Sequence, residues 1–279
     1  MKKLIQKAIP KIVGFYLNSL SFAAPKLAAD KALYLFATPR KGKILDNQKE
    51  FLNTSVQEKI FLNEIPIMTY SWEGEGNTVL LAHGWESNAF RWSKLIQKLR
   101  TDNYHVVALD APAHGESGSS QFNALLYAEF INEAVQRFQP QVLIGHSVGG
   151  MASAFYHKKY QFKELDKLVL LGTPSEFVNV FKNYTDLLGY NSRLRNHLNQ
   201  MIVERFGNTP ESFSAALHLN DIPTKGLVIH DRNDMIIPYD EALLINASFK
   251  NAKLITTEGL GHSLHHDSVN KYILEFLNS

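Results

Sequence analysis

The alternation of short apolar runs with helical patterns from residue 55 onward constrains the fold most strongly. Buried parallel strands appear as short continuous apolar runs, whereas amphipathic helices have apolar residues three or four positions apart. The expected strands are Thr78–His83, His105–Asp110, Gln141–Gly145, Leu168–Gly172, Gly226–Asp231 and Lys253–Thr257, preceded by a hairpin over 59–71. Helical patterns between successive strands indicate βαβ units. We therefore predict an α/β fold with a mostly parallel central sheet that is flanked by helices.

The stretch 174–223 contains no strand pattern. Its apolar residues, such as Phe177 and Phe181, instead recur at helical spacing. Connections in α/β units usually have about 2–6 residues, so this insert is unusually long. We predict a helical cap or lid over 174–223, inserted into a core formed by 55–173 and 224–279. Ordinary outer-layer helices of the same domain are the alternative.

Residues 1–54 precede this pattern and are expected to form a helical extension. Apolar residues such as Ile5, Ile9 and Ile12 recur at helical spacing, with lysines on the other side. Such a helix usually packs on a domain surface, but a basic amphipathic helix can also lie on a membrane. Polar residues interrupt the stretch, so neither a signal peptide nor the ~18 apolar residues of a membrane span is expected. We expect a cytoplasmic protein, with peripheral membrane contact through 1–25 as the alternative.

Composition excludes several classes of function. The chain of 279 residues carries 29 Lys and Arg against 27 Asp and Glu, so a nucleic-acid partner has little electrostatic support. There is no cysteine, which excludes a cysteine nucleophile, a disulfide framework and a thiolate metal site. Neither a phosphate-binding GxxxxGK[ST] loop nor a dinucleotide-binding GxGxxG turn follows a strand. We expect a small-molecule partner and no cofactor.

The motif GHSVG at 145–149 lies between an expected strand and an expected helix. Ligands of open α/β sheets bind beyond the carboxyl ends of the strands, where this serine would lie. A sharp turn with small flanking residues would hold the Ser147 hydroxyl above the sheet and place the Val148 amide at a helix N-terminus. We therefore predict that Ser147 is a nucleophile and that the Val148 N–H stabilises an oxyanion. A serine in a purely structural glycine-rich turn is the alternative.

A serine hydroxyl needs a base to take its proton, and the base needs a carboxylate to orient it. His262 follows the last expected strand and fits the base, with His265 and His266 as rivals nearer the last helix. The spacing of these histidines does not place ligands on one helix face, so no metal site is expected. Asp231 and Asp234 both follow the strand GLVIH, and Asp234 precedes an apolar run that can exclude water. We favour Asp234 as the acid.

The strand TVLLAH ends in the turn HGW at 83–85. Glycine lets the backbone approach a substrate closely, so the Trp85 amide is the expected second oxyanion donor. We expect the Trp85 indole to line the substrate site together with Phe177, Phe181 and Tyr184 of the insert. These aromatic side chains favour a small or medium apolar substrate. Packing of the same residues against one another is the alternative.

These motifs resemble the α/β-hydrolase superfamily, specifically its single-domain branch with a helical cap. The resemblance covers residues 60–277 and rests on HGW (83–85), DAPAHGES (110–117), GHSVGG (145–150), DRNDMIIP (231–238) and GLGHS (259–263). It implies a triad in the order Ser147, Asp234, His262 and hydrolysis of a carboxylic ester through an acyl-enzyme. Thioesters, amides and carbon–carbon bonds are alternative substrates, and a non-catalytic ligand receptor is a further alternative. Ala113 replaces the first glycine of the family's usual Gly-His-Gly turn.

Overall fold

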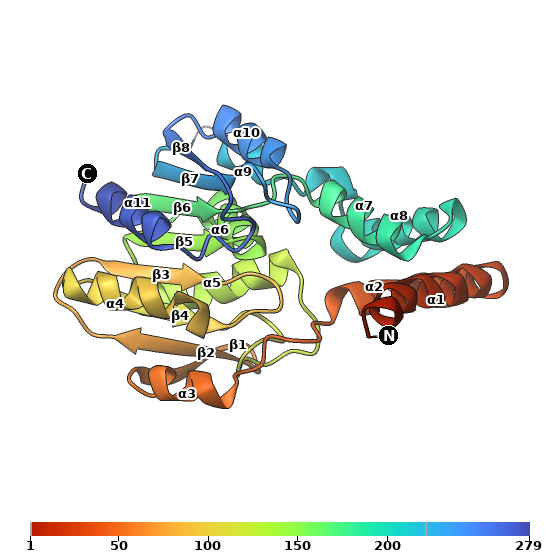
Figure 1. Ribbon diagram of the computed structural model, residues 1–279, viewed down its shortest axis with the longest axis horizontal. Coiled ribbons are helices and arrows are strands. Elements are labelled where there is room, and N and C mark those ends of the chain that lie inside the picture. Colours follow the sequence, from red (N-terminus) through yellow and green to blue (C-terminus); the bar gives the residue numbers. More distant parts are fainter. Residues whose placement is uncertain (1, 221) are drawn as a thin grey trace. The chain divides into compact units, whose positions relative to one another are not determined.

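The computed structural model describes residues 2–220 and 222–279, with side chains from residue 8 onward, and contains an eight-stranded sheet in this part of the chain (Figure 1). The strand order is β1-β2-β4-β3-β5-β6-β7-β8. The strands are β1 (Val56–Leu62), β2 (Ile65–Trp72), β3 (Thr78–Ala82), β4 (His105–Leu109), β5 (Val142–His146), β6 (Lys167–Leu171), β7 (Lys225–Asp231) and β8 (Ala252–Thr257). β1 and β2 form an antiparallel hairpin, β2 is antiparallel to β4, and the remaining neighbours are parallel. The predicted α/β fold is confirmed.

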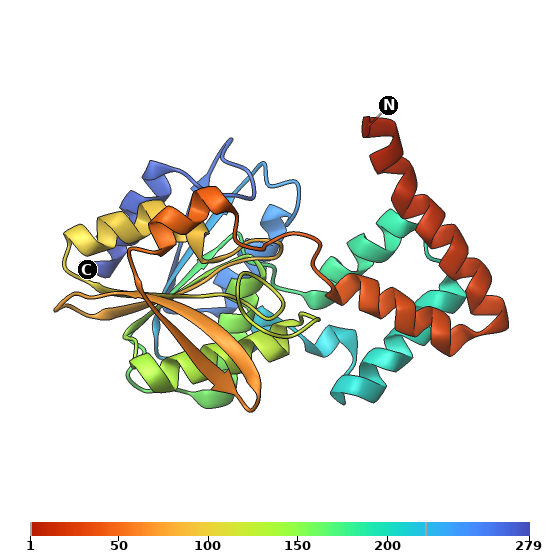
Figure 2. The same cartoon turned by 90° about the horizontal axis from the view of Figure 1, so that it is seen from below.

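Helices cover both faces of this sheet. The helices α3, α4 and α11 lie on one face, and α5 and α6 lie on the other (Figure 2). Two shorter elements continue the second layer, since α9 contacts α6 and α10 contacts α9. Their bounds are α3 (Asp46–Leu52), α4 (Ser93–Thr101), α5 (Ala124–Phe138), α6 (Val148–Tyr160), α9 (Ala215–Leu219), α10 (Tyr239–Ser248) and α11 (Asp267–Leu277), with a 3-10 turn at Ala89–Trp92.

Apolar side chains fill the space between the sheet and its helices. Leu81, Ile144 and Ile229 project from β3, β5 and β7 and are completely buried. They belong to one cluster with Trp92 and Ile273 from the helical layer. Complete burial of an aliphatic side chain of this size contributes about 1.5–3 kcal/mol. This packing fixes the carboxyl ends of the parallel strands and the loops that leave them.

The chain divides into two compact units. The core unit contains the sheet and consists of 39–175 and 215–279. The helical unit consists of 1–38 and 176–214. Its elements are α1 (Lys2–Ala23), α2 (Pro25–Ala37), α7 (Phe177–Leu188), α8 (Ser192–Phe206) and a 3-10 turn at Pro210–Ser212.

The two units do not follow the boundaries that were expected from the sequence. The segment 1–38 joins the insert in one unit instead of forming a separate extension, and 39–54 belong to the core unit. The ends of the expected cap, 174–175 and 215–223, also belong to the core unit, and residue 221 lies outside the described residues. The physical reason is that α1 and α2 share an apolar interior with α8, which the spacing of residues along the chain does not reveal.

The interior of the helical unit is built from both of its segments. Its buried members are Leu17, Ala28, Ala29, Ala32, Leu33, Phe181, Leu188, Tyr190, Leu194, Leu198 and Ile202. The small alanines on α2 let the helices approach closely, while the leucines of α8 fill the remaining space. Neither segment covers its own apolar face, so each needs the other to exclude water.

Polar contacts also join α1 to the insert. Gly14 lies so near Leu188 that an added Cβ would be 1.7 Å from the Leu188 carbonyl oxygen. One helical turn further along, the Asn18 side chain donates to the Gly189 carbonyl at 2.8 Å and accepts from the Asn191 amide at 2.9 Å. These groups lie where α7 ends and α8 begins and lack partners within a helix. A single side chain of α1 therefore satisfies the ends of two other helices.

Candidate active site

Ser147 forms the sharp turn between β5 and α6. Its φ of 53° and ψ of −126° lie in a region that residues with a Cβ rarely adopt, at a cost of about 1–3 kcal/mol. The Ser147 amide donates to the Leu171 carbonyl of β6 at 2.8 Å, which fastens the turn to the neighbouring strand. A Cβ at Gly149 would lie 2.4 Å from the Ala82 carbonyl oxygen, so this turn requires a glycine there. The strained turn is thus held by its surroundings on both sides.

Three side chains from separate loops form one hydrogen-bonded chain beyond β5, β7 and β8. His262 Nε2 lies 3.0 Å from Ser147 Oγ, and His262 Nδ1 lies 2.7 Å from Asp234 Oδ2. Because an ionised carboxylate only accepts, Nδ1–H must donate to Asp234, which leaves Nε2 free to accept from the serine hydroxyl. The imidazole is therefore held in the tautomer that a general base requires.

The Asp234 carboxylate is embedded in hydrogen-bond donors. Its Oδ1 accepts from the Ile236 amide at 2.8 Å and the Ile237 amide at 2.9 Å. His230 Nε2 lies 3.4 Å from the other oxygen and donates to the Ile237 carbonyl at 2.9 Å. Burial by itself raises the pKa of Asp234, but the hydrogen bonds from His230, His262 and the two amides outweigh it and hold the pKa below its ordinary value. The group that faces His262 is consequently an anion at neutral pH.

Asp231, the other candidate acid, is engaged elsewhere. Its carboxylate accepts from the Thr257 hydroxyl at 2.8 Å and from the amides of Leu260 and Asn233, each at 2.9 Å. Burial raises the pKa of Asp231, yet these donors together leave it below its ordinary value. Asp231 therefore ties the end of β7 to the turn that leads to His262, and it does not contact the imidazole through any hydrogen bond described for these residues.

The two backbone amides predicted to stabilise an oxyanion belong to the two turns that meet at the serine. An added Cβ at Gly84 would be 3.0 Å from the Ser147 Cβ, so the turn after β3 passes directly beside the turn after β5. Trp85 follows in that turn. Val148 is the first residue of α6, and the first amides of a helix have no carbonyl within the helix to bind. Both N–H groups thus belong to backbone segments that border the serine.

His83 holds the turn after β3 in shape. Its Nδ1 donates to the Gly84 carbonyl at 2.7 Å, and its Nε2 accepts from the Ala111 amide at 2.9 Å. Complete burial lowers the pKa of His83 to about 4, so the ring is neutral and keeps its acceptor at neutral pH. Ala113, which stands where the resemblance leads one to expect glycine, has a φ of 65° and accepts the strain of a left-handed conformation.

Two side chains that the sequence analysis did not single out hold the loop of His262. His146 Nε2 donates to the His262 carbonyl at 2.9 Å, and the Arg91 guanidinium donates to the Ser263 carbonyl. Burial lowers the pKa of His146 most strongly, and the neighbouring Arg91 and His262 lower it further. The sequence could have indicated His146 and His230, because each is a polar residue at the end of a buried apolar strand.

Gly172, just after β6, completes the surroundings of the imidazole. Its φ is +54°, and an added Cβ would lie 3.5 Å from His262 Nδ1 and 3.6 Å from its Cε1. Glycine therefore suits this position because of its backbone conformation more than because of space. In the sequence it was only the last residue of an expected strand.

The aromatic candidates fall into two groups. The half-buried Trp85 ring contacts His114 and Phe122 in the core unit, with ring centroids 5.4 Å and 5.3 Å apart. Phe177, Phe181 and Tyr184 lie on α7 in the helical unit. Their ring centroids are 6.1, 5.3 and 4.8 Å from that of Phe36 on α2. These three rings therefore pack against other aromatic side chains, as the alternative to a substrate site supposed. Their place in a substrate site stays a prediction.

The remaining histidines near His262 have other roles. His266 precedes α11, and its Nδ1 accepts from the Ser268 amide at 3.2 Å, which caps the helix. His265 is exposed, and burial of part of its ring lowers its pKa. Within residues 2–220 and 222–279, no group of three or more His, Asp or Glu side chains is placed to hold a metal ion.

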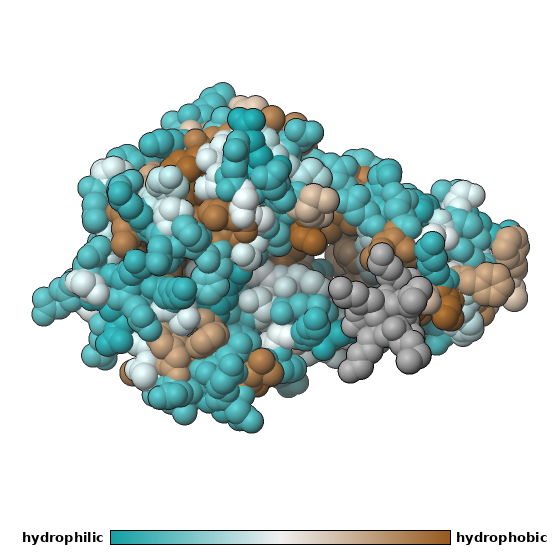
Figure 3. Space-filling model, in the orientation of Figure 1, coloured by the Kyte–Doolittle hydropathy of each residue, from teal (hydrophilic) through white to brown (hydrophobic). Residues whose placement is uncertain are grey.

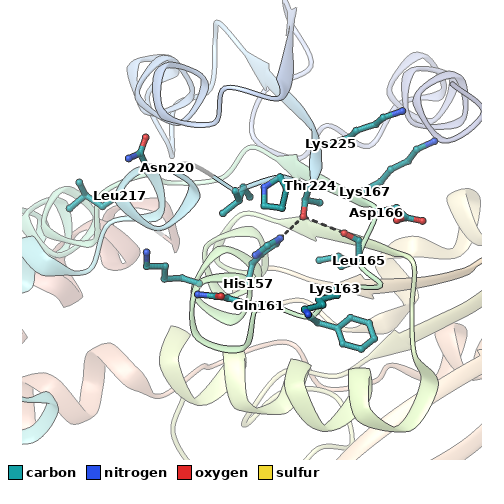
Figure 4. Close-up of a pocket in the computed structure, with 14 residues that line it drawn as sticks. His157, Gln161, Lys163, Leu165, Asp166, Lys167, Leu217, Asn220, Thr224 and Lys225 are labelled. Carbon is teal, nitrogen blue, oxygen red and sulfur yellow. Dashed lines mark hydrogen bonds between the residues drawn. The ribbon is translucent and has the colours of Figure 1, made fainter.

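A hollow of about 840 Å³ opens at the opposite edge of the sheet from Ser147, where β6 and β7 begin (Figure 4). It is lined by polar side chains that include Lys163, Lys167 and Lys225. His157 Nε2 donates to the Thr224 hydroxyl at 2.6 Å within it. Because the amino and carboxyl ends of parallel strands are at opposite edges of a sheet, this hollow contributes nothing to the arrangement around the serine.

Comparison with known proteins agrees with this fold. Residues 79–272 match the model of the alpha/beta hydrolase family. The non-heme chloroperoxidase CPO-A1 of Kitasatospora aureofaciens is 26% identical over 270 residues, which cover 77% of this chain and 96% of that protein. The pimeloyl-[acyl-carrier protein] methyl ester esterase of Vibrio cholerae is 29% identical over 117 residues, or 39% of this chain and 43% of that protein.

Among solved structures, an esterase from Exiguobacterium antarcticum superposes with a TM-score of 0.63 at 16% identity, over 80% of this chain and 100% of the other. At that identity the superposition supports the fold alone. The family match spans more than half of the sequence and runs from β3 through β8, so it includes the parallel strands and the loops between them. The chain belongs to the alpha/beta hydrolase family.

Proposed function

We propose that this protein is a serine hydrolase that cleaves a carboxylic ester through an acyl-enzyme on Ser147. The observation that carries the proposal is the chain of hydrogen bonds from Ser147 Oγ to His262 Nε2 and from His262 Nδ1 to Asp234, at 3.0 and 2.7 Å. A hydroxyl next to a base that is itself oriented by a carboxylate is the arrangement that activates a weak oxygen nucleophile. The similarity to a methyl ester esterase supports an ester over other acyl compounds.

In the first half-reaction, Ser147 Oγ attacks the ester carbonyl carbon while its proton passes to His262 Nε2. The imidazolium that forms is stabilised by the Asp234 carboxylate on its Nδ1 side. The tetrahedral intermediate then collapses, the carbon–oxygen bond to the alcohol breaks, and Nε2 returns the proton to the departing alkoxide. The products of this step are a free alcohol and a serine ester.

In the second half-reaction, water takes the place of the alcohol. His262 Nε2 removes a proton from the water as it attacks the acyl carbon, and a second tetrahedral intermediate forms. Its collapse breaks the bond to Ser147 Oγ, which recovers its proton from Nε2. The carboxylic acid leaves, and the enzyme returns to its starting protonation state.

The Trp85 and Val148 amides are proposed to donate to the oxyanion in both intermediates. An oxyanion-hole donor typically contributes about 2.7–4 kcal/mol to transition-state stabilisation. The support for this role is the position of the two backbone segments beside the serine and the helix N-terminus at Val148.

The proposed substrate is a small or medium apolar ester, with Trp85, Phe177, Phe181 and Tyr184 as candidate contacts. Thioesters, amides and carbon–carbon bonds next to a carbonyl can react at the same triad, so the leaving group must be tested directly. A panel of p-nitrophenyl esters of increasing acyl length, an acyl-CoA and an aminoacyl anilide separates these classes. Turnover of the short and medium p-nitrophenyl esters is the expected result, and activity on the anilide alone would overturn the ester assignment.

A fluorophosphonate probe tests the nucleophile independently of the substrate. The folded wild-type protein should be labelled at Ser147, and Ser147→Ala should lose both labelling and ester turnover while keeping its melting temperature. Ser248→Ala, which removes a hydroxyl at the end of α10, should behave like the wild type. Absence of labelling and of turnover across the panel in the folded protein would instead favour a ligand receptor built on a hydrolase fold.

A further inference from the structure

Helix α1 presents large apolar side chains to solvent. The exposed fractions are 49% for Ile9, 66% for Ile12, 75% for Phe15, 56% for Tyr16 and 69% for Phe22. Ile9, Ile12, Phe15 and Phe22 are three or seven apart in turn, and Tyr16 is four after Ile12 and seven after Ile9, so the five side chains share one outward face. The opposite side of α1 is buried, with Leu17 at 1% exposure. Helix α1 is therefore apolar on two sides, and only one of them is covered.

Contacts on the covered side of α1 hold its outward face toward solvent. Asn18 hydrogen-bonds to both Gly189 and Asn191, and the Arg193 guanidinium donates to the Ser21 carbonyl at 3.0 Å. With Gly14 in close contact with the 188 carbonyl, α1 cannot roll to bury its outward face within the helical unit. The aromatic residues Phe15 and Phe22 are thus displayed by a helix that is already held in place.

Charge is divided unevenly between the two units. The helical unit contains ten Lys and Arg against five Asp and Glu, a net charge of +5, whereas the core unit has 19 against 22, a net charge of −3. The first acidic residue of the chain is Asp30, and it pairs with Arg205 of α8. Five lysines precede it. The apolar face therefore belongs to a surface that attracts anions.

The lysines also border the apolar face. Lys11 is next to Ile12 on α1, and the exposed Lys26 and Lys31 are on α2, which follows directly. Leu27 and Tyr34 on α2 are exposed apolar side chains as well. Figure 3 shows brown and tan residues gathered at the end of the helical unit where α1 meets α2. Apolar and basic side chains are thus interleaved on two consecutive helices.

We propose that the outward face of α1 binds the surface of an anionic lipid bilayer. Aromatic and aliphatic side chains on one helix face, with lysines at its edge, are what an interfacial helix needs to insert below the phosphates while its cations contact them. No helix of the described residues is long and apolar enough to cross a bilayer, so the helix lies on the surface. A second copy of the chain fits less well, because pairing two such faces would bring together two helical units that each carry a net charge of +5.

The first experiment measures co-sedimentation of the full-length protein with vesicles. Wild type should bind vesicles that contain phosphatidylglycerol in phosphatidylcholine, and binding should fall roughly tenfold or more in the double variant Phe15→Gln, Phe22→Gln. The matched control is Leu243→Gln, Leu244→Gln, which removes two exposed leucines from α10 in the core unit and should bind like the wild type. Wild-type protein that stays in the supernatant, or a phenylalanine variant that binds normally, would overturn the proposal.

The second experiment tests the charge. Each lysine near an anionic surface contributes about a fivefold increase in binding, so Lys11→Gln, Lys26→Gln should weaken binding to the phosphatidylglycerol vesicles by roughly 25-fold. Pure phosphatidylcholine vesicles should bind the wild type weakly and should not distinguish it from this variant. Equal binding of wild type and variant to the anionic vesicles contradicts the charge argument.

A fluorophore supplies a readout that does not depend on sedimentation. Because the chain has no cysteine, Phe15→Cys and Leu243→Cys can each carry one environment-sensitive dye. Vesicles should shift the emission of the dye at position 15 to the blue and leave the dye at 243 unchanged. A shift at both positions or at neither opposes the proposal. A dimer that Phe15→Gln, Phe22→Gln converts to a monomer, without vesicle binding, would assign the face to self-association instead.

Discussion

The core unit and the helical unit of this protein are specified by the sequence in different ways. In the core unit, each strand carries its own pattern, and polar residues that follow different strands come together because the carboxyl ends of the parallel strands lie at one edge. In the helical unit, α1 and α8 carry apolar faces of the ordinary kind, yet what covers each face lies far away in the sequence. The chemistry of a parallel sheet can therefore be read locally, whereas the pairing of amphipathic helices cannot.

The largest effect is expected from replacing, one at a time, the two carboxylates Asp231 and Asp234, which lie at the end of β7 and just after it. Asp234→Asn should lower kcat by roughly 10⁴-fold, because the amide no longer holds His262 in the required tautomer. Asp231→Asn should mainly lower the free energy of unfolding, by about 1–3 kcal/mol, because buried donors lose a charged acceptor. Ester hydrolysis kinetics and denaturant titration of both variants measure the two effects. A larger rate loss in Asp231→Asn would exchange the roles of the two residues.

Gly14→Ala tests whether α1 is an integral part of the helical unit. The new Cβ would collide with the Leu188 carbonyl oxygen at 1.7 Å, so the helices must separate, at a cost of about 1–3 kcal/mol. Hydrogen exchange should accelerate in α1, α2, α7 and α8 and remain unchanged in the sheet. Ser19→Ala, on the exposed side of the same helix, is the matched control and should leave exchange as it is. Uniform acceleration in both units would show that they unfold as one.

Gly172→Ala probes the surroundings of the imidazole with a smaller expected effect. The added Cβ finds room at 3.4 Å or more from His262, but alanine at a φ of +54° costs about 1–2 kcal/mol. We expect a modest loss of stability by thermal unfolding and a rate loss of only a few fold. A rate loss comparable to that of Asp234→Asn would mean that small displacements of His262 abolish activity.

Ionisation of Asp234 should contribute to the pH dependence of the free energy of unfolding. The pKa of its carboxyl in the folded protein is below the ordinary value of 3.8, so the ionised form stabilises the fold above that value. This contribution is lost as the pH falls through the folded pKa. The free energy of unfolding should therefore begin to decrease below about pH 4, and the decrease should be smaller in Asp234→Asn. Parallel slopes for the two proteins in urea titrations would assign the acid sensitivity to other groups.

Much of the fold followed from the sequence because its signals are local. Runs such as TVLLAH and QVLIG predict buried strands, and their order along the chain leads directly to the sheet. The same signals placed Ser147, Asp234 and His262 after three different strands, and the structure joins these residues by hydrogen bonds. Both Asp231 and Asp234 follow the same strand, so choosing Asp234 depended on a further argument, the apolar run that comes after it.

The remaining features of the structure could not be predicted, because they depend on contacts between residues that are far apart in the sequence. Nothing in the spacing of Asn18 indicates that it satisfies the ends of α7 and α8. The support that His146 gives to the His262 loop is equally invisible, because a histidine after an apolar strand has many possible partners. Backbone strain could not be predicted either. Ala113 has a φ of 65°, a left-handed conformation that alanine does not favour.

The contact between Asn18 and Gly189 bridges 171 positions of the chain, and this has a consequence for biosynthesis. At about 5–20 residues per second, the ribosome needs roughly 10–40 seconds to deliver α7 and α8 after α1 has emerged. Throughout that interval the inner apolar side of α1 can pack against α2 but lacks α7 and α8, which complete its cover in the folded protein. Such a polypeptide is expected to depend on chaperones during translation, and its yield should fall when elongation is slowed.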